Sequence, residues 1–148
     1  MLAETPKDLL RAAAEAARNA YAPYSGFAVG AAAQTADGSV FTGANMENAS
    51  HGLTVDAEMG ALQAASTAGK LSEIVQIAVV GGRMEAGERN RAVVTPCGRC
   101  RQLILEAAHL GARDIDVWCA DLDLTSIHRF KISELLPHGF GPANLGMG

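Results

Sequence analysis

Hydrophobic and polar positions follow helical or strand periods along most of the chain, and these periods predict its elements. Apolar residues at helical spacing predict a helix near the N-terminus, a second over residues 55–70 and a third that begins at Cys97. Strands are predicted over residues 27–33, 39–46, 74–80, 115–120 and 127–131, followed by one helical turn over 133–136. The alternation of strands and helices indicates an α/β sandwich.

Local signals place the ends of these elements. Thr5 is expected to cap the first helix, which should end before Pro23, while Gly69 and Gly111 are expected to end the second and third. Asp37 and Gly38 predict a tight hairpin between the first two strands. The apolar run over 74–80 is typical of a strand covered on both faces, and the polar segment 81–95 is predicted to be a loop beside a site.

Size and charge narrow the classes of function. A chain of 148 residues is expected to form a single domain over 1–148. Its net charge of -4 argues against a nucleic-acid polymer as partner, because such binding depends on clustered Lys and Arg. The polar N-terminus and the lack of a long apolar run predict a cytoplasmic protein with no membrane partner.

Cys97 and Cys100 form a Cys-x-x-Cys pair at the start of a predicted helix. Residues three apart lie on one side of a helix, and the positive end of the helix favours thiolates. A zinc site fits this pattern, although a redox pair or half of a structural zinc site has the same spacing. The chain offers no second Cys-x-x-Cys and no His-x-x-His pair, which favours an open, catalytic zinc. Cys119 is expected to be a buried strand residue.

Asp56 and Glu58 lie at the start of the second predicted helix. The first and third residues of a helix diverge by about 200°, so one can bind a metal while the other faces a water molecule. A His-x-Glu followed by Pro-Cys-x-x-Cys is the signature of zinc deaminases, and it matches here with Asp56 in the position of the first ligand. We therefore expect Asp56 to complete the metal site and Glu58 to be catalytic. Asp56 as a simple helix-terminal acid and His51 as a rival third ligand remain alternatives.

The chain resembles the cytidine deaminase family over nearly its whole length. The similar stretches are residues 23–32, 43–49, 57–58, 96–102 and 135–142. The resemblance implies a three-layer α/β/α sandwich with a mixed sheet of about five strands, and one Zn²⁺ per subunit. It also implies hydrolytic deamination of cytidine or 2′-deoxycytidine in pyrimidine salvage. A homotetramer with shared sites is implied as well, in which Phe140 reaches a base bound to a neighbouring subunit.

The same resemblance assigns residues to the substrate. Phe27 is expected to pack against the pyrimidine, while Asn45 and Glu47 are expected to bind the ribose 3′-hydroxyl. Backbone groups at Ala57 and near Thr95 are expected to hold the edge of the base. A carboxylate and an amide suit a sugar hydroxyl, because together they accept and donate hydrogen bonds.

The sequence departs from that family around the metal. Asp56 stands where the family has Cys or His, and Met59 stands where many members have Arg. Two thiolates and a carboxylate carry a charge of -3, which Arg99 is placed to offset. An Arg between the two cysteines also resembles the blasticidin S deaminase branch. Two alternatives follow: a deaminase of N4-modified or blasticidin-like nucleosides, and a catalytically degenerate zinc- or nucleoside-binding protein.

Overall fold

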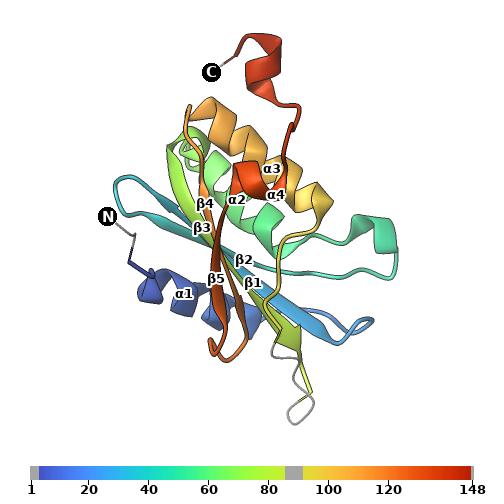
Figure 1. Cartoon of the computed structure of the whole chain (residues 1–148). Coiled ribbons are helices and arrows are strands. Elements are labelled where there is room, and N and C mark those ends of the chain that lie inside the picture. The colour runs from blue at the N-terminus through green and yellow to red at the C-terminus, as the bar shows by residue number, and fades with distance from the viewer. Residues whose placement is uncertain (1–3, 86–91, 148) are drawn as a thin grey trace.

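A five-stranded mixed sheet forms the centre of the molecule (Figure 1). The computed structural model describes residues 4–85 and 92–147. The sheet has the order β2-β1-β3-β4-β5, in which β3 and β4 are parallel and the other neighbours are antiparallel. Its strands are β1 (Phe27–Thr35), β2 (Val40–Ala44), β3 (Ile74–Arg83), β4 (Asp116–Asp121) and β5 (Ile127–Lys131). The helices are α1 (Lys7–Ala17), α2 (Ala57–Thr67), α3 (Gly98–Leu110) and α4 (Ile132–Leu135).

The helices cover both faces of the sheet and give three layers. Leu9, Leu10 and Ala13 of α1 pack on one face, against a cluster that includes Ala32 and Trp118. Helices α2 and α3 lie on the other face, where Figure 1 shows them side by side. The three-layer α/β/α sandwich expected from the sequence is confirmed.

Two glycines allow the helices to approach the sheet closely. A Cβ at Gly43 of β2 would lie 2.4 Å from the carbonyl oxygen of Ala57, the first residue of α2. A Cβ at Gly30 of β1 would lie 1.9 Å from the carbonyl oxygen of Ala13 in α1. Both distances are too short for any side chain, so these positions require glycine. Gly43 thereby determines how near the start of α2 lies to the sheet.

The ends of several elements differ from the predictions. Strand β3 continues through residues 81–83, where a loop was predicted, because these residues pair with 27–29 of β1. Residues 86–91 of that predicted loop lie outside the described part of the chain. Helix α2 begins at Ala57 and not at Val55, since Val55 forms a β-bridge with Met46. Thr5 does not cap α1, whose N-cap residue is Pro6.

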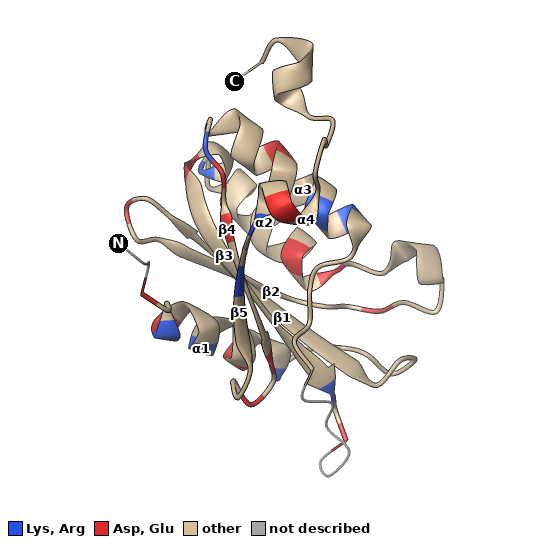
Figure 2. Ribbon diagram, viewed as in Figure 1, with Lys and Arg blue, Asp and Glu red and all other residues tan. Residues whose placement is uncertain are grey.

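Short 3-10 turns at His51–Leu53, Leu71–Glu73 and Pro142–Leu145 were not predicted. Figure 2 shows acidic and basic residues interspersed over the helices and the sheet. In the part of the chain that the structure describes, no helix has both the length and the apolar character needed to cross a membrane.

Candidate functional site

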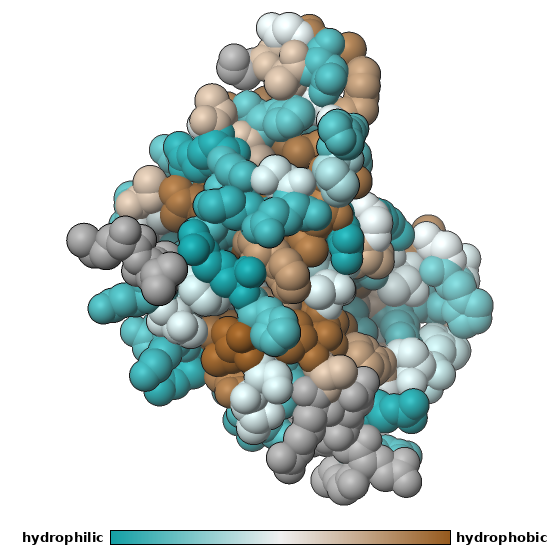
Figure 3. Space-filling model, viewed as in Figure 1, coloured by the Kyte–Doolittle hydropathy of each residue, from teal (hydrophilic) through white to brown (hydrophobic). Residues whose placement is uncertain are grey.

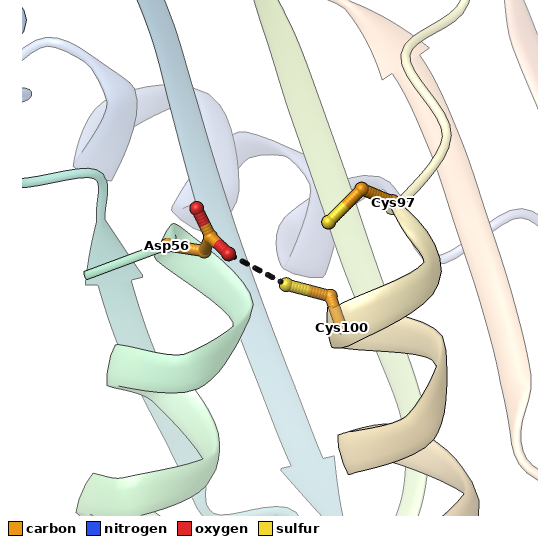
Figure 4. A group of neighbouring side chains, drawn as sticks. All are labelled: Asp56, Cys97 and Cys100. Atoms are coloured by element: carbon orange, nitrogen blue, oxygen red, sulfur yellow. Dashed lines mark hydrogen bonds between the residues drawn. The ribbon is translucent and has the colours of Figure 1, made fainter. Parts of the chain in front are cut away.

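The starts of α2 and α3 bring three potential metal ligands together. Asp56 is the N-cap residue of α2, Cys97 is the N-cap residue of α3, and Cys100 lies in the first turn of α3. One ligand atom from each side chain lies within 4.8 Å of the others. Figure 4 shows the three side chains converging from the two helix ends. The sequence predicted this grouping, although 41 positions separate Asp56 from Cys97.

Asp56 does not act as an ordinary helix cap. An Asp in the N-cap position usually accepts a hydrogen bond from a backbone N–H of the first turn, but Asp56 makes no side-chain cap bond. Its Oδ2 instead accepts a hydrogen bond from the Cys100 thiol at 3.4 Å. The carboxylate is therefore turned toward the cysteines, as a metal ligand would be.

The chemistry of this group fits a divalent cation. Burial raises the pKa of the Cys100 thiol, and the charges of Glu58 and Asp56 raise it further. Each of these acids makes ionisation of the others less favourable, so all of them can lose their protons together only beside a positive charge. A bound cation supplies that charge, and the positive ends of two helices add to it. Two thiolates and a carboxylate are accepted zinc ligands, and three protein ligands leave the fourth position free, as in catalytic zinc sites.

His51, the rival third ligand, lies elsewhere. Its ring makes an edge-to-face contact with Tyr24 at a centroid distance of 5.3 Å. It is exposed in the 3-10 turn before α2 and, among residues 4–85 and 92–147, is not a member of the group that could hold a metal ion. The geometry therefore favours Asp56.

Glu58 lies in the first turn of α2, and only 4% of it is exposed. Burial is the main cause that raises the pKa of its carboxyl group, and the neighbouring charge of Asp56 adds to the increase. The Cys100 side chain lowers this pKa in part, so the carboxyl group lies beside one of the potential ligands. A buried carboxyl group with a raised pKa is suited to accept and return protons near neutral pH.

Arg99, which was expected to offset the charge of the three potential ligands, contacts the neighbouring helix α2. Its Nη2 lies 3.7 Å from the Sδ of Met59, on the neighbouring helix α2. The guanidinium group thus contacts Met59, which stands where the resemblance leads one to expect an Arg in many members. Arg99 of α3 therefore brings a positive charge to Met59 of α2.

Asn45 is tied to the start of β1. Its Oδ1 accepts a hydrogen bond from the Val29 N–H at 2.9 Å, and its Nδ2 donates one to the Phe27 carbonyl at 2.9 Å. An amide side chain has two N–H donors and two acceptor lone pairs, so one of each stays available. Asn45 therefore fixes the backbone at Phe27 and still has capacity for a ligand.

Glu47 is held by the loop before β1. Its carboxylate accepts hydrogen bonds from the backbone N–H groups of Tyr24 and Ser25, at 3.0 and 3.1 Å, and from the Ser25 hydroxyl. The Ser25 hydroxyl is the main cause that lowers the pKa of Glu47. Glu47 is thus an ionised acceptor whose orientation is fixed.

The remaining predicted residues lie on several different elements. Ala57 is fully buried at the start of α2, and Thr95 is exposed two residues before Cys97. Phe140 is 62% exposed and lies beyond α4. Cys119 is fully buried in β4, as predicted, and burial raises the pKa of its thiol to about 12.

Arg101 was missed by the sequence reasoning. It follows Cys100 directly, and its side chain contacts the loop before Cys97 and the end of α4. An Arg next to a metal ligand was the available signal, but the sequence alone does not show which groups a long side chain reaches.

Known proteins resemble the chain in sequence and in fold. The family model described as the cytidine and deoxycytidylate deaminase zinc-binding region matches residues 3–112. A cytidine deaminase of Halalkalibacterium halodurans is 43% identical over 132 residues, which are 89% of this chain and 91% of that protein.

Solved structures agree with these matches. The cytidine deaminase from Burkholderia pseudomallei superposes with a TM-score of 0.80 at 40% identity, covering 93% of this chain and 100% of that one. The enzyme from Mycobacterium tuberculosis has a TM-score of 0.69 at 36% identity, covering 93% and 99%. The family match and the Asp and Cys group support zinc as the metal. The chain therefore belongs to the cytidine and deoxycytidylate deaminase family.

Proposed function

We propose that this protein catalyses the zinc-dependent hydrolysis of cytidine or 2′-deoxycytidine to uridine or 2′-deoxyuridine and ammonia, as a step of pyrimidine salvage. The observation that carries the proposal is the placement of a buried glutamate, Glu58, beside the group of Asp56, Cys97 and Cys100. The similar proteins named above are cytidine deaminases, so a blasticidin-like or N4-modified substrate is not favoured.

Asp56, Cys97 and Cys100 hold the zinc ion in this proposal. Zinc supplies Lewis acidity, which makes a water molecule nucleophilic near neutral pH. Glu58 accepts a proton from the attacking water as its oxygen bonds to C4. The same carboxyl group passes this proton to N3, then takes the remaining proton of the oxygen added at C4 and delivers it to the leaving amine, so that the C4–N4 bond breaks, a C4 carbonyl forms and ammonia departs.

Substrate contacts follow from the residues around the metal group. Asn45 and Glu47 bind the ribose 3′-hydroxyl with the donor and acceptor positions that their internal hydrogen bonds leave available. Phe27, which begins β1, packs against the pyrimidine ring. Backbone groups at Ala57 and Thr95 hold the edge of the base.

Phe140 belongs to the site of a neighbouring subunit in a homotetramer. Its high exposure supports this role, as do the exposures of Leu145 at 67% and Met147 at 54%. Figure 3 shows hydrophobic side chains in the C-terminal segment at the top of the view. Apolar side chains grouped on an exposed segment are typical of a surface that another chain covers.

An activity assay with three substrates tests the proposal. The purified protein is incubated with cytidine, 2′-deoxycytidine and N4-methylcytidine, and both the released amine and the pyrimidine product are measured. We expect uridine or 2′-deoxyuridine with equimolar ammonia from the first two. Turnover of N4-methylcytidine alone, or zinc binding without turnover of any of the three, would contradict the proposed substrate.

A further inference from the structure

The Arg101 side chain joins two segments that are far apart in the sequence. Its Nε donates a hydrogen bond to the Pro96 carbonyl at 2.7 Å, and its Nη2 lies 3.4 Å from the Thr95 hydroxyl oxygen. Its Nη1 donates to the Leu135 carbonyl at 2.8 Å. One guanidinium group therefore connects the loop before Cys97 to the last residue of α4.

Backbone geometry places this connection directly beside the metal ligands. Arg101 follows Cys100, and its backbone N–H donates to the Cys97 carbonyl at 2.9 Å. The side chain then returns past the helix start to the two residues before Cys97. Backbone and side chain together hold the loop on both sides of the first cysteine.

The same helix also holds the segment after α4. The Gln102 amide donates to the Phe140 carbonyl at 2.8 Å, and the His109 Nδ1 accepts from the Ala143 N–H at 3.2 Å. Gly139 lies so close to α3 that a Cβ there would be 2.6 Å from the Leu105 side chain. Helix α3 thus carries both cysteines at its start and the C-terminal segment along its side.

We propose that Arg101 is a positioning residue that keeps two segments in register on α3: the Cys97 loop (residues 93–97) and the end of α4, from which the Phe140 segment (residues 136–141) continues. The role rests on the proposed function, because it links a subunit's own metal site to the aromatic residue that it supplies to a neighbour. Arg101 reaches the metal and the substrate only through these segments. Replacement of Arg101 therefore makes the Cys97 loop and the Phe140 segment more mobile together.

The geometry of arginine suits this task. Its planar guanidinium group has five N–H donors in a fixed fork, whereas lysine has a compact ammonium group with three donors. A lysine at this position preserves the charge but does not span the acceptors of both segments. Comparison of Arg101→Lys with Arg101→Gln therefore distinguishes the effect of the positive charge from the effect of the guanidinium geometry.

Arg113 provides a matched control. Its Nη1 donates to the Glu73 and Ile74 carbonyls at 3.2 and 3.4 Å. Arg113 follows α3, and like Arg101 it uses its guanidinium group to bind backbone carbonyls, here at the start of β3. Arg113→Gln removes a guanidinium group bonded to backbone carbonyls but leaves the Cys97 loop and the Phe140 segment in place.

The experiment compares the zinc-loaded wild type with Arg101→Lys, Arg101→Gln and Arg113→Gln. Zinc release to a coloured chelator, the KM for cytidine, the melting temperature and amide hydrogen exchange are measured for each. We expect both Arg101 variants to release zinc about tenfold faster, as is usual when an outer partner of a metal ligand is lost. Their KM rises, and exchange increases at residues 93–97 and 136–141 together. Arg113→Gln keeps wild-type zinc release and KM.

Two results would overturn the proposal. The first is wild-type zinc release and exchange in Arg101→Lys, which would show that charge alone suffices. The second is equal zinc release from Arg113→Gln and Arg101→Gln at an equal loss of melting temperature, which would show general destabilisation. Zinc release and hydrogen exchange need no substrate. A wild type that holds zinc without deaminating cytidine would therefore contradict only the proposed function.

Discussion

The Cys100 Sγ lies 3.4 Å from the Asp56 Oδ2, which joins the start of α3 to the start of α2. A thiol and a carboxylate are both acids, and Cys97 and Glu58 add two more acidic groups beside them. When these acidic groups at two positive helix ends are ionised together, they can bind a cation.

Replacement of Glu58 by Gln should remove catalysis and leave the metal site intact. The amide has nearly the same shape as the carboxyl group but cannot accept and return a proton. We expect turnover of cytidine to fall by about 10²–10⁴-fold, with zinc content and melting temperature close to those of the wild type. Glu106→Gln is the control, since Glu106 is an exposed glutamate of α3. Equal turnover by Glu58→Gln and the control would remove Glu58 from the mechanism.

A methyl group at Gly43 should disturb the metal site by displacing the start of α2. The Cβ of Gly43→Ala would lie 2.4 Å from the Ala57 carbonyl, so the start of α2 must shift. We expect a loss of about 1–3 kcal/mol in the free energy of unfolding, together with weaker zinc retention.

Gly60→Ala is the matched control for that variant. Gly60 faces Gly43, but its added Cβ would meet the Gly43 Cα at an ordinary 3.5 Å. Alanine is also favoured over glycine inside a helix, by up to about 1 kcal/mol. Chemical denaturation and chelator competition measure both effects. The account of α2 placement would be wrong if Gly43→Ala unfolded and retained zinc like the wild type.

Asp121, the last residue of β4, should make the stability of the fold depend on pH. Its carboxylate, 1% exposed, accepts hydrogen bonds from Ser126 and from the backbone and hydroxyl of Thr125. Burial raises the pKa of Asp121, but these hydrogen bonds together outweigh it and lower the pKa. The stabilisation is therefore complete above the pKa of the unfolded chain, about 4, and is lost as the pH falls through the lower folded value.

Denaturation of Asp121→Asn at several pH values checks this linkage. We expect the variant to be less stable by about 2 kcal/mol at pH 7, because a charged buried acceptor is lost. The difference from the wild type should shrink as the pH falls below about 4. A difference that stays constant down to pH 2 would show that ionisation of Asp121 does not contribute.

The sequence was most informative where a local pattern determined the structure. The strand patterns over 27–33 and 39–46, the Asp37 and Gly38 turn between them and the apolar run of β3 predicted three strands that the structure shows as neighbours, because each pattern depends on nearby residues. The Cys97 and Cys100 spacing predicted a shared direction for the same reason. Their meeting with Asp56 came from the deaminase signature and not from periodicity.

Features that depend on the folded chain were not predicted. The extension of β3 through Gly81 follows from its pairing with β1, and the start of α2 follows from the bridge made by Val55. Contact between Arg99 and Met59 depends on how two helices lie side by side. The reach of Arg101 likewise depends on where α4 ends, which no local pattern determines.

The zinc content of Asp56→Ala, measured by elemental analysis beside the wild type and His51→Ala, tests the central claim most directly. The account predicts close to one zinc ion per chain in the wild type and in His51→Ala, and a large loss of zinc and of cytidine turnover in Asp56→Ala. Full zinc content and wild-type turnover in Asp56→Ala would contradict it.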